Sequence, residues 1–227
     1  MSKHITEKEK LEHLKKTFPR IGFEGFFYFE ICSEAYTSME RAREEVKKLQ
    51  EHRRKEGKLR GLGQKGMDLL GEIPKQESIA IAFAAMCLEA CMWDYAACNT
   101  SQNKAEEKFG SLNLVAKWIV IPQLLCGSDI TKRRIGGTSL LGKLRDLKDA
   151  RNELVHPKSK PLPDNYNDAI KATIPKPKSI TAEDAFGLIG LLLGELEKVD
   201  KTNWWFFQTP AYRNSIKKHQ SETTSRP

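Results

Sequence analysis

Apolar positions recur at three- and four-residue spacing through most of the chain and predict an all-α protein. The clearest case is the segment 139–158, where the apolar residues would fall on one face of a helix. These residues are Leu140, Leu141, Leu144, Leu147, Ala150, Leu154 and Val155. Ser139 is suited to cap the start of this helix and Pro157 to end it. We find no strand pattern of any length and no internal repeat.

Two more helices are predicted upstream. From Phe23 to about Lys55 an apolar, aromatic half is followed by a charged half, so this helix should start in the core and project outward. Ser78 to Cys98 is the most apolar segment and should form the central buried helix of a bundle. Its length would suit a membrane span, but Glu89 and Asp94 would each cost about 2.5–3.5 kcal/mol near a bilayer centre.

The remaining segments predict shorter elements and loops. Gly57 to Gly71 is a glycine-rich connector, and the G-x-G-x-x-G string inside it follows no strand, so it does not indicate a dinucleotide site. Ser101 to Phe109 is polar and predicts a loop. Leu112 to Leu125 predicts a helix that is kinked or stopped near Pro122. The basic loop from Cys126 to Gly137 could cradle phosphate or be a solvated turn.

After Pro157 the character of the chain changes. A proline-rich connector precedes a helix that Thr181 should cap and that should run to about Lys198. The aromatic cluster Trp204–Phe207 follows, and we favour packing onto the core or at a subunit contact over base stacking. The expected organisation is an N-terminal helical extension (1–21), a helical bundle (22–158), the connector (159–180), a C-terminal helix and aromatic segment packing on the bundle (181–212), and a disordered tail (213–227).

Charge and cysteine content add limits on function. The net charge of +8 favours a polyanionic partner but also serves solubility. Ten basic and four acidic residues fall between Arg41 and Lys65. This charged stretch is either a solvent-exposed helix face or a surface that binds nucleic acid. No secretory signal is evident in residues 1–20. The odd number of cysteines fits a reducing cytosol. For Cys87, Cys91 and Cys98 we favour a role as small core residues over zinc binding.

Chemically useful groups gather at the end of the 139–158 helix. Arg151, Asn152, Glu153 and His156 lie within six residues, and Pro157 biases His156 away from helical geometry. Arg151 precedes His156 by about 7.5 Å along the axis, a gap that its side chain can cover. The pair could handle a phosphate, or it could only stabilise the helix dipole and pair with nearby carboxylates. Glu89, buried in the central helix, needs a partner such as Lys117 or Arg151.

Arg151-Asn152, three residues and then His156-Pro157 resemble the signature of HEPN domains, in which an arginine precedes a histidine by four to six residues. The placement of the motif on a late helix of an all-helical chain adds to the resemblance, as does the upstream stretch 117–122. The resemblance covers roughly 22–158. It implies a bundle of the HEPN type that dimerises and brings two Arg/His pairs into one cleft.

Many HEPN domains are metal-independent endoribonucleases, often of toxin–antitoxin or antiviral systems. The resemblance implies catalytic roles for Arg151, Asn152 and His156, and a homodimer acting on RNA without a cofactor or metal. We expect Glu89 and Lys117 to support the site structurally, and a cytoplasmic protein without membrane contact. The residues expected to bind substrate are Lys132, Arg133, Arg134 and Lys158.

Other members of the family have lost activity. The alternative prediction is therefore a non-catalytic helical module that binds nucleic acid, a nucleotide or a protein partner, such as an antitoxin, through the same cleft. RNA cleavage in EDTA would discriminate the two, because a module without catalysis would bind RNA and leave it intact.

Overall fold

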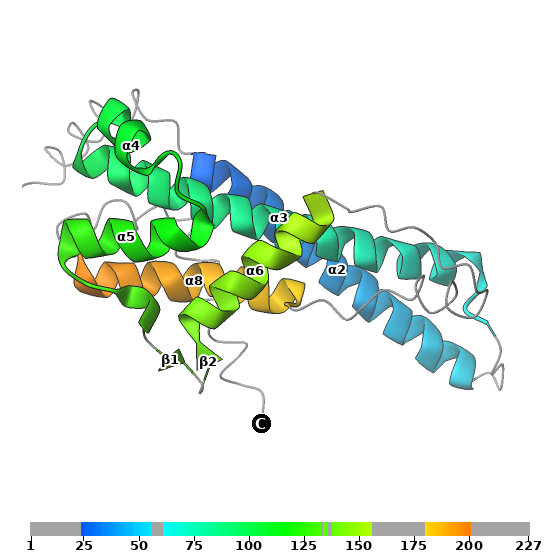
Figure 1. Ribbon diagram of the computed structural model, residues 1–227. Helices are drawn as coiled ribbons and strands as arrows, with labels where there is room; N and C mark the ends of the chain where they lie inside the picture. Colours follow the sequence, from blue (N-terminus) through cyan, green and yellow to red (C-terminus); the bar gives the residue numbers. More distant parts are fainter. Residues whose placement is uncertain (1–23, 56–60, 133, 136–137, 156–179, 201–227) are drawn as a thin grey trace, which may run out of the picture.

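The computed structural model describes residues 24–55, 61–132, 134–135, 138–155 and 180–200, and in these residues the protein is an all-α bundle (Figure 1). The helices are α2 (Glu24–Lys55), α3 (Gly63–Asn99), α4 (Gln102–Phe109), α5 (Leu114–Cys126), α6 (Leu140–Val155) and α8 (Ala182–Val199), with a 3₁₀ turn η2 (Ile130–Lys132). Two short strands, β1 (Arg134–Ile135) and β2 (Thr138–Ser139), pair antiparallel. The predicted all-α class is confirmed.

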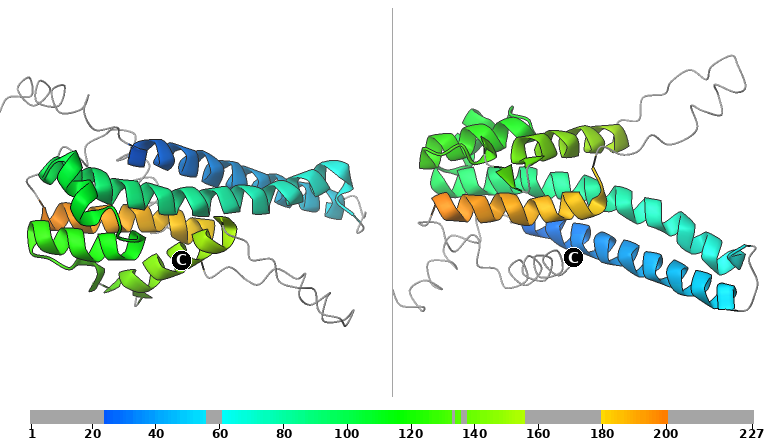
Figure 2. Two further views of the ribbon diagram at one scale, coloured as in Figure 1. Left: turned by 45° about the horizontal axis from the view of Figure 1, so that its top comes forward. Right: turned by 90° about the horizontal axis from the view of Figure 1, so that it is seen from below.

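Helices α2 and α3 form a long antiparallel pair on which the other helices are assembled. The ends that meet near Lys55 and Gly63 extend beyond α6 and α8 and form an arm (Figure 2). This arrangement confirms that α2 starts in the core and projects outward. On and near the arm, exposed charges pair with one another: Lys65 lies 3.6 Å from Glu45, and Lys75 lies 3.3 Å from Glu72. Such exposed pairs contribute about 0–1 kcal/mol each.

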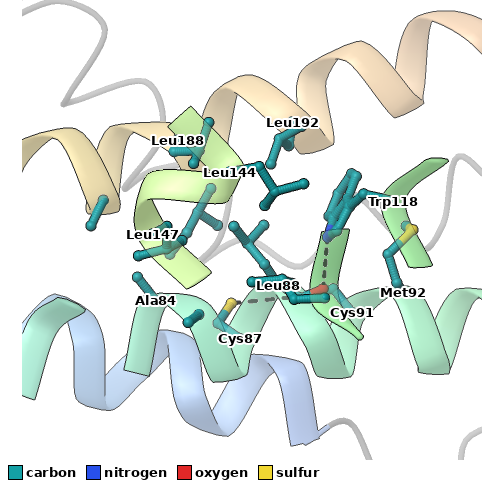
Figure 3. Close-up of a cluster of buried hydrophobic side chains, with 14 of the residues drawn as sticks. Ala84, Cys87, Leu88, Cys91, Met92, Trp118, Leu144, Leu147, Leu188 and Leu192 are labelled. Carbon is teal, nitrogen blue, oxygen red and sulfur yellow. Dashed lines mark hydrogen bonds between the residues drawn. The ribbon is translucent and has the colours of Figure 1, made fainter. Parts of the chain in front are cut away.

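The core is centred on the second half of α3, as predicted for the segment 78–98. Leu88 and Met92 of α3 are fully buried and lie among side chains from α5, α6 and α8 (Figure 3). The Trp118 indole of α5 is also fully buried, and its Nε1 donates a hydrogen bond of 3.0 Å to the Leu88 carbonyl. The small residues of α3 allow neighbouring helices to approach closely. Buried members of this kind are Ala80, Ala84, Ala85, Cys87, Cys91, Ala96 and Ala97.

The predicted helix starts at Ser139 and Thr181 are confirmed. Ser139 Oγ accepts a hydrogen bond from the Gly142 amide at 3.0 Å, and Thr181 Oγ1 accepts one from the Asp184 amide at 3.1 Å. These bonds satisfy amides that have no partner inside the first turn. Helix α8 packs against α3, and its Phe186 stacks on Tyr36 of α2 with ring centroids 5.0 Å apart.

Two loop predictions are wrong. The predicted connector 57–71 is helical from Gly63 onward; Gly61 and Gly63 supply positive φ angles of 72° and 70° at the turn, after which the chain continues as α3 through Pro74. The segment 101–109 contains α4, which Ser101 caps and which buries only Ala105 and Phe109. Glycine content obscured the first helix, and sparse apolar positions obscured the second.

Helix α5 does not stop near Pro122. It continues through this proline to Cys126 and ends at Gly127, whose φ of 69° is left-handed. The helix survives its internal proline because Trp118, Ile121 and Pro122 itself are buried. Tertiary packing of the apolar face outweighs the lost backbone hydrogen bond.

One described helix, α3, is long and apolar enough by length and composition to cross a membrane. Most of its apolar window, 61%, is buried inside the bundle. A buried core helix of this length has the same composition, so this finding alone does not place the protein in a membrane.

Candidate functional site

Arg151 lies in the last turns of α6 and is held there by the buried face of that helix. Leu144, Leu147 and Ala150 are buried against the core, which leaves Arg151 half-buried at the edge of the same face. Its Nη1 donates a hydrogen bond of 3.1 Å to Asn152 Oδ1. The described part of α6 ends at Val155, so His156 and Lys158 lie outside the described residues.

Arg151 lines a pocket of about 500 Å³ between the helices. Residues of α2, α3, α4, α5 and α6 line it. The charged lining residues are Glu24, Glu89, Lys117 and Arg151, and the others are Tyr28, Met86, Ala90, Trp93 and Gln102. The pocket is open to solvent, and its lining combines apolar side chains with four charged ones.

The partner that Glu89 needs is Lys117. Lys117 Nζ lies 3.1 Å from Glu89 Oε1, with the lysine side chain 8% exposed and the carboxylate 33% exposed. Burial of the ammonium group is tolerated because the carboxylate neutralises it. The sequence offered Lys117 and Arg151 as alternatives, and the described contacts select the first. Arg151 therefore remains the pocket cation that this ion pair does not neutralise.

The aromatic wall of the pocket is fixed by a second contact. Trp93 Nε1 donates a hydrogen bond of 3.2 Å to Glu106 Oε2 of α4. This bond holds the indole against α4, the segment for which the sequence predicts a loop. Tyr28 packs against Phe83, with ring centroids 5.9 Å apart. Both aromatic side chains are partly exposed, so part of each remains accessible to a ligand.

The basic loop before α6 is not brought to this pocket in the described residues. Lys132 is 81% exposed and pairs with Asp129 at 3.5 Å, as a solvated turn would. It does not line the pocket with Arg151. Arg133 lies outside the described residues, and Arg134 is described only as backbone in β1.

Sequence reasoning missed Glu24, Tyr28, Trp93 and Gln102 as site residues. Trp93 lies in the segment 78–98, for which the sequence predicts the central buried helix. One signal was present: Met86, Glu89, Ala90 and Trp93 recur at three- and four-residue spacing, so the charged residue and the tryptophan share one face of α3. This spacing places Trp93 beside Glu89, whose carboxylate needs a cation whether or not the face borders a cavity.

Within the described residues, no group of three or more His, Cys, Asp or Glu side chains could hold a metal ion. Two of the three α3 thiols are core groups: Cys87 and Cys91 are buried with their Sγ atoms 4.0 Å apart, while Cys98 is partly exposed. Burial raises the pKa of the Cys87 thiol well above its ordinary value, which keeps it protonated.

Comparison of the chain with protein-family models, curated proteins and solved structures found no match. A functional interpretation therefore depends on the motif and on the geometry around Arg151.

Asp94 gives the site region a testable pH dependence. Its side chain is 1% exposed; Oδ2 accepts a weak bond from the Gly25 amide at 3.5 Å, and Oδ1 has no hydrogen-bond partner among the described residues. Burial, with a smaller contribution from the Glu24 charge, raises the Asp94 pKa to about 7, against the bond from Gly25, which lowers it. The folded protein thus holds this proton more tightly than the unfolded chain.

We expect Asp94 to stabilise the fold least at high pH. The contribution of Asp94 to the free energy of unfolding is fully present below pH 4. It is lost as the pH rises through about 7, and the total loss is at most about 4 kcal/mol. Asp94→Asn should therefore gain stability relative to the wild type between pH 5 and pH 8 in urea unfolding. Asp68→Asn, at an exposed position of the same helix, is the matched control. A pH-independent difference between Asp94→Asn and the wild type would contradict the assignment.

Proposed function

We propose that the protein is a metal-independent endoribonuclease of the HEPN type. The observation that supports this most is the position of Arg151: the arginine of the Arg-x4-His motif lies at the end of α6 and lines a pocket. Asn152, the polar residue that often follows the arginine in such motifs, contacts the guanidinium.

The proposed chemistry uses the 2′-hydroxyl of the RNA as the nucleophile. His156 exchanges a proton near neutral pH, because its ordinary pKa is about 6.5. Arg151 is always charged and can bind two oxygens of the scissile phosphate, which stabilises the charge that develops there. The 2′-oxygen bonds to phosphorus, the 5′-oxygen of the next nucleotide leaves with a proton, and a 2′,3′-cyclic phosphate remains.

The experiment that tests this function compares two oligonucleotides in EDTA. One is RNA, and the other carries a 2′-deoxy sugar at the mapped cleavage position. We expect the purified protein to cut the first, with a 2′,3′-cyclic phosphate on the upstream product, and to leave the second intact at that position. Cleavage of both strands, or cleavage that requires Mg²⁺, would exclude the mechanism.

A two-fold dimer is part of the proposal. An isologous contact doubles whatever lies near its axis, so an Arg/His pair becomes a four-residue site. Val155, adjacent to His156, is 48% exposed at the end of α6, where an apolar side chain is available for such a contact. We expect light scattering after size exclusion to give twice the chain mass of 25.8 kDa at tens of micromolar. A monomer at this concentration would contradict a shared site.

The second candidate function is a non-catalytic binding module. The carboxylate of Glu24 favours it, since it lines the same pocket as Arg151 and would repel a second phosphate. Salt-dependent RNA binding with no product in EDTA would replace the ribonuclease proposal with this one.

A further inference from the structure

We propose that the pocket between α2, α3, α4, α5 and α6 binds a guanine nucleotide, with the base stacked on Trp93 and the phosphate at Arg151. One part of the inference rests on the proposed ribonuclease function: that the phosphate cleaved in RNA is the one next to the bound guanine. The binding of the guanine nucleotide itself follows from the lining of the pocket.

The dimensions and walls of the pocket suit one nucleotide. Its volume of about 500 Å³ lies within the range of about 300–1,000 Å³ for small-molecule sites. Met86 and Ala90 supply apolar wall, and Trp93 supplies an aromatic surface next to them on the same face of α3. Stacking of a base on an aromatic side chain contributes about 1–3 kcal/mol. The bond from Trp93 to Glu106 holds the indole in place before the ligand arrives.

The charges are divided between a phosphate-binding group and a base-binding group. Lys117 and Glu89 neutralise each other across 3.1 Å, so the two remaining charged lining residues are Arg151 and Glu24. A guanidinium is suited to phosphate, with several donors in a planar fork. A carboxylate accepts hydrogen bonds only, so a ligand group that bonds to Glu24 must present N–H or O–H donors.

Guanine is the base that meets this requirement. Its Watson–Crick edge presents N1–H and the N2 amino group side by side, and a carboxylate can accept from both at once. Adenine and cytosine present one amino group beside an unprotonated ring nitrogen, which would face the carboxylate with its lone pair. Uracil presents a single N–H between two carbonyl oxygens. Glu24, in the first turn of α2 and exposed, can adopt the bidentate geometry without breaking the Lys117–Glu89 pair.

The first experiment measures binding of GMP, AMP, CMP and UMP by isothermal titration calorimetry, which requires no cleavage. We expect GMP to bind at least tenfold more tightly than the other three nucleotides. Glu24→Gln should remove most of this preference, while Glu30→Gln, an exposed glutamate of the same helix outside the pocket, should keep it. Trp93→Ala should weaken all four nucleotides together. Equal binding of the four nucleotides, or no binding of any, would overturn the proposal.

The second experiment tests cleavage of oligonucleotides with one variable base in a pyrimidine strand. We expect the cleaved phosphate to be adjacent to guanine, with a preference of at least tenfold that Glu24→Gln removes. GMP binding that depends on Glu24 without any RNA cleavage would remove the ribonuclease function and leave the guanine site. RNA cleavage without base preference and without GMP binding would remove the guanine site and leave the ribonuclease function.

Discussion

Arg151→Ala should reduce RNA cleavage in EDTA at least 100-fold and leave the helical circular-dichroism signal unchanged. Loss of one group that stabilises the developing charge costs about 10²–10³ in rate. The guanidinium is half-buried at the end of α6, and it donates a hydrogen bond to the neighbouring Asn152. Truncation therefore removes little core packing, and we expect the melting temperature to change by no more than a few degrees.

Three further variants sharpen this test. His156→Ala should lose about 10²–10⁴ in rate, as expected for a general acid or base. Arg151→Lys should retain part of the activity, because lysine keeps the charge and loses the planar fork. Arg145→Ala, at an exposed position of α6 outside the pocket, is the matched control and should cleave like the wild type. If Arg151→Ala unfolds the protein, Arg151 is a structural residue and the catalytic assignment fails.

Segments with regular apolar spacing could be predicted from the sequence. The central part of α3 and the whole of α6 have apolar residues at three- and four-residue intervals, and both are helices with buried faces. The N-terminal part of α3 could not be predicted in this way, because Gly63 and Gly66 lower helix propensity. This part is stabilised by contact along α2, which is a tertiary interaction. Helix α4 likewise depends on burial of Ala105 and Phe109 against the rest of the bundle.

The candidate site could be predicted only in part. Arg151 was singled out by a local motif, and the Glu89–Lys117 pair by the requirement of a buried carboxylate for a cation. The contributions of Glu24 and Trp93 come from helices that meet only in the folded protein. Nothing local distinguishes an aromatic residue of the core from one that borders a cavity, and this difference decides whether Trp93 can contact a ligand.

The largest loss of stability should follow from Trp118→Ala. Trp118 is fully buried at the contact of α5 with α3, and its indole fills space beside Leu88 and Met92 (Figure 3). Replacing a buried tryptophan by alanine costs about 3–5 kcal/mol, through lost apolar contact and the cavity left behind. For a chain of this size about 1 kcal/mol corresponds to 2–4 °C, so we expect the melting temperature to fall by about 6–20 °C.

Two variants separate packing from hydrogen bonding at this position. Trp118→Phe keeps much of the ring volume and loses the bond to the Leu88 carbonyl, which can still accept the helical amide four residues later. We expect Trp118→Phe to lose about 1–2 kcal/mol, well below the alanine variant. Leu124→Ala, at an exposed position of α5, should change the free energy of unfolding by less than about 0.5–1 kcal/mol. If urea unfolding gives the same small change for Trp118→Ala and Leu124→Ala, the packing of α5 on α3 does not stabilise the core. The position of Lys117 beside Glu89 depends on that packing, so the ion pair would then lack its support.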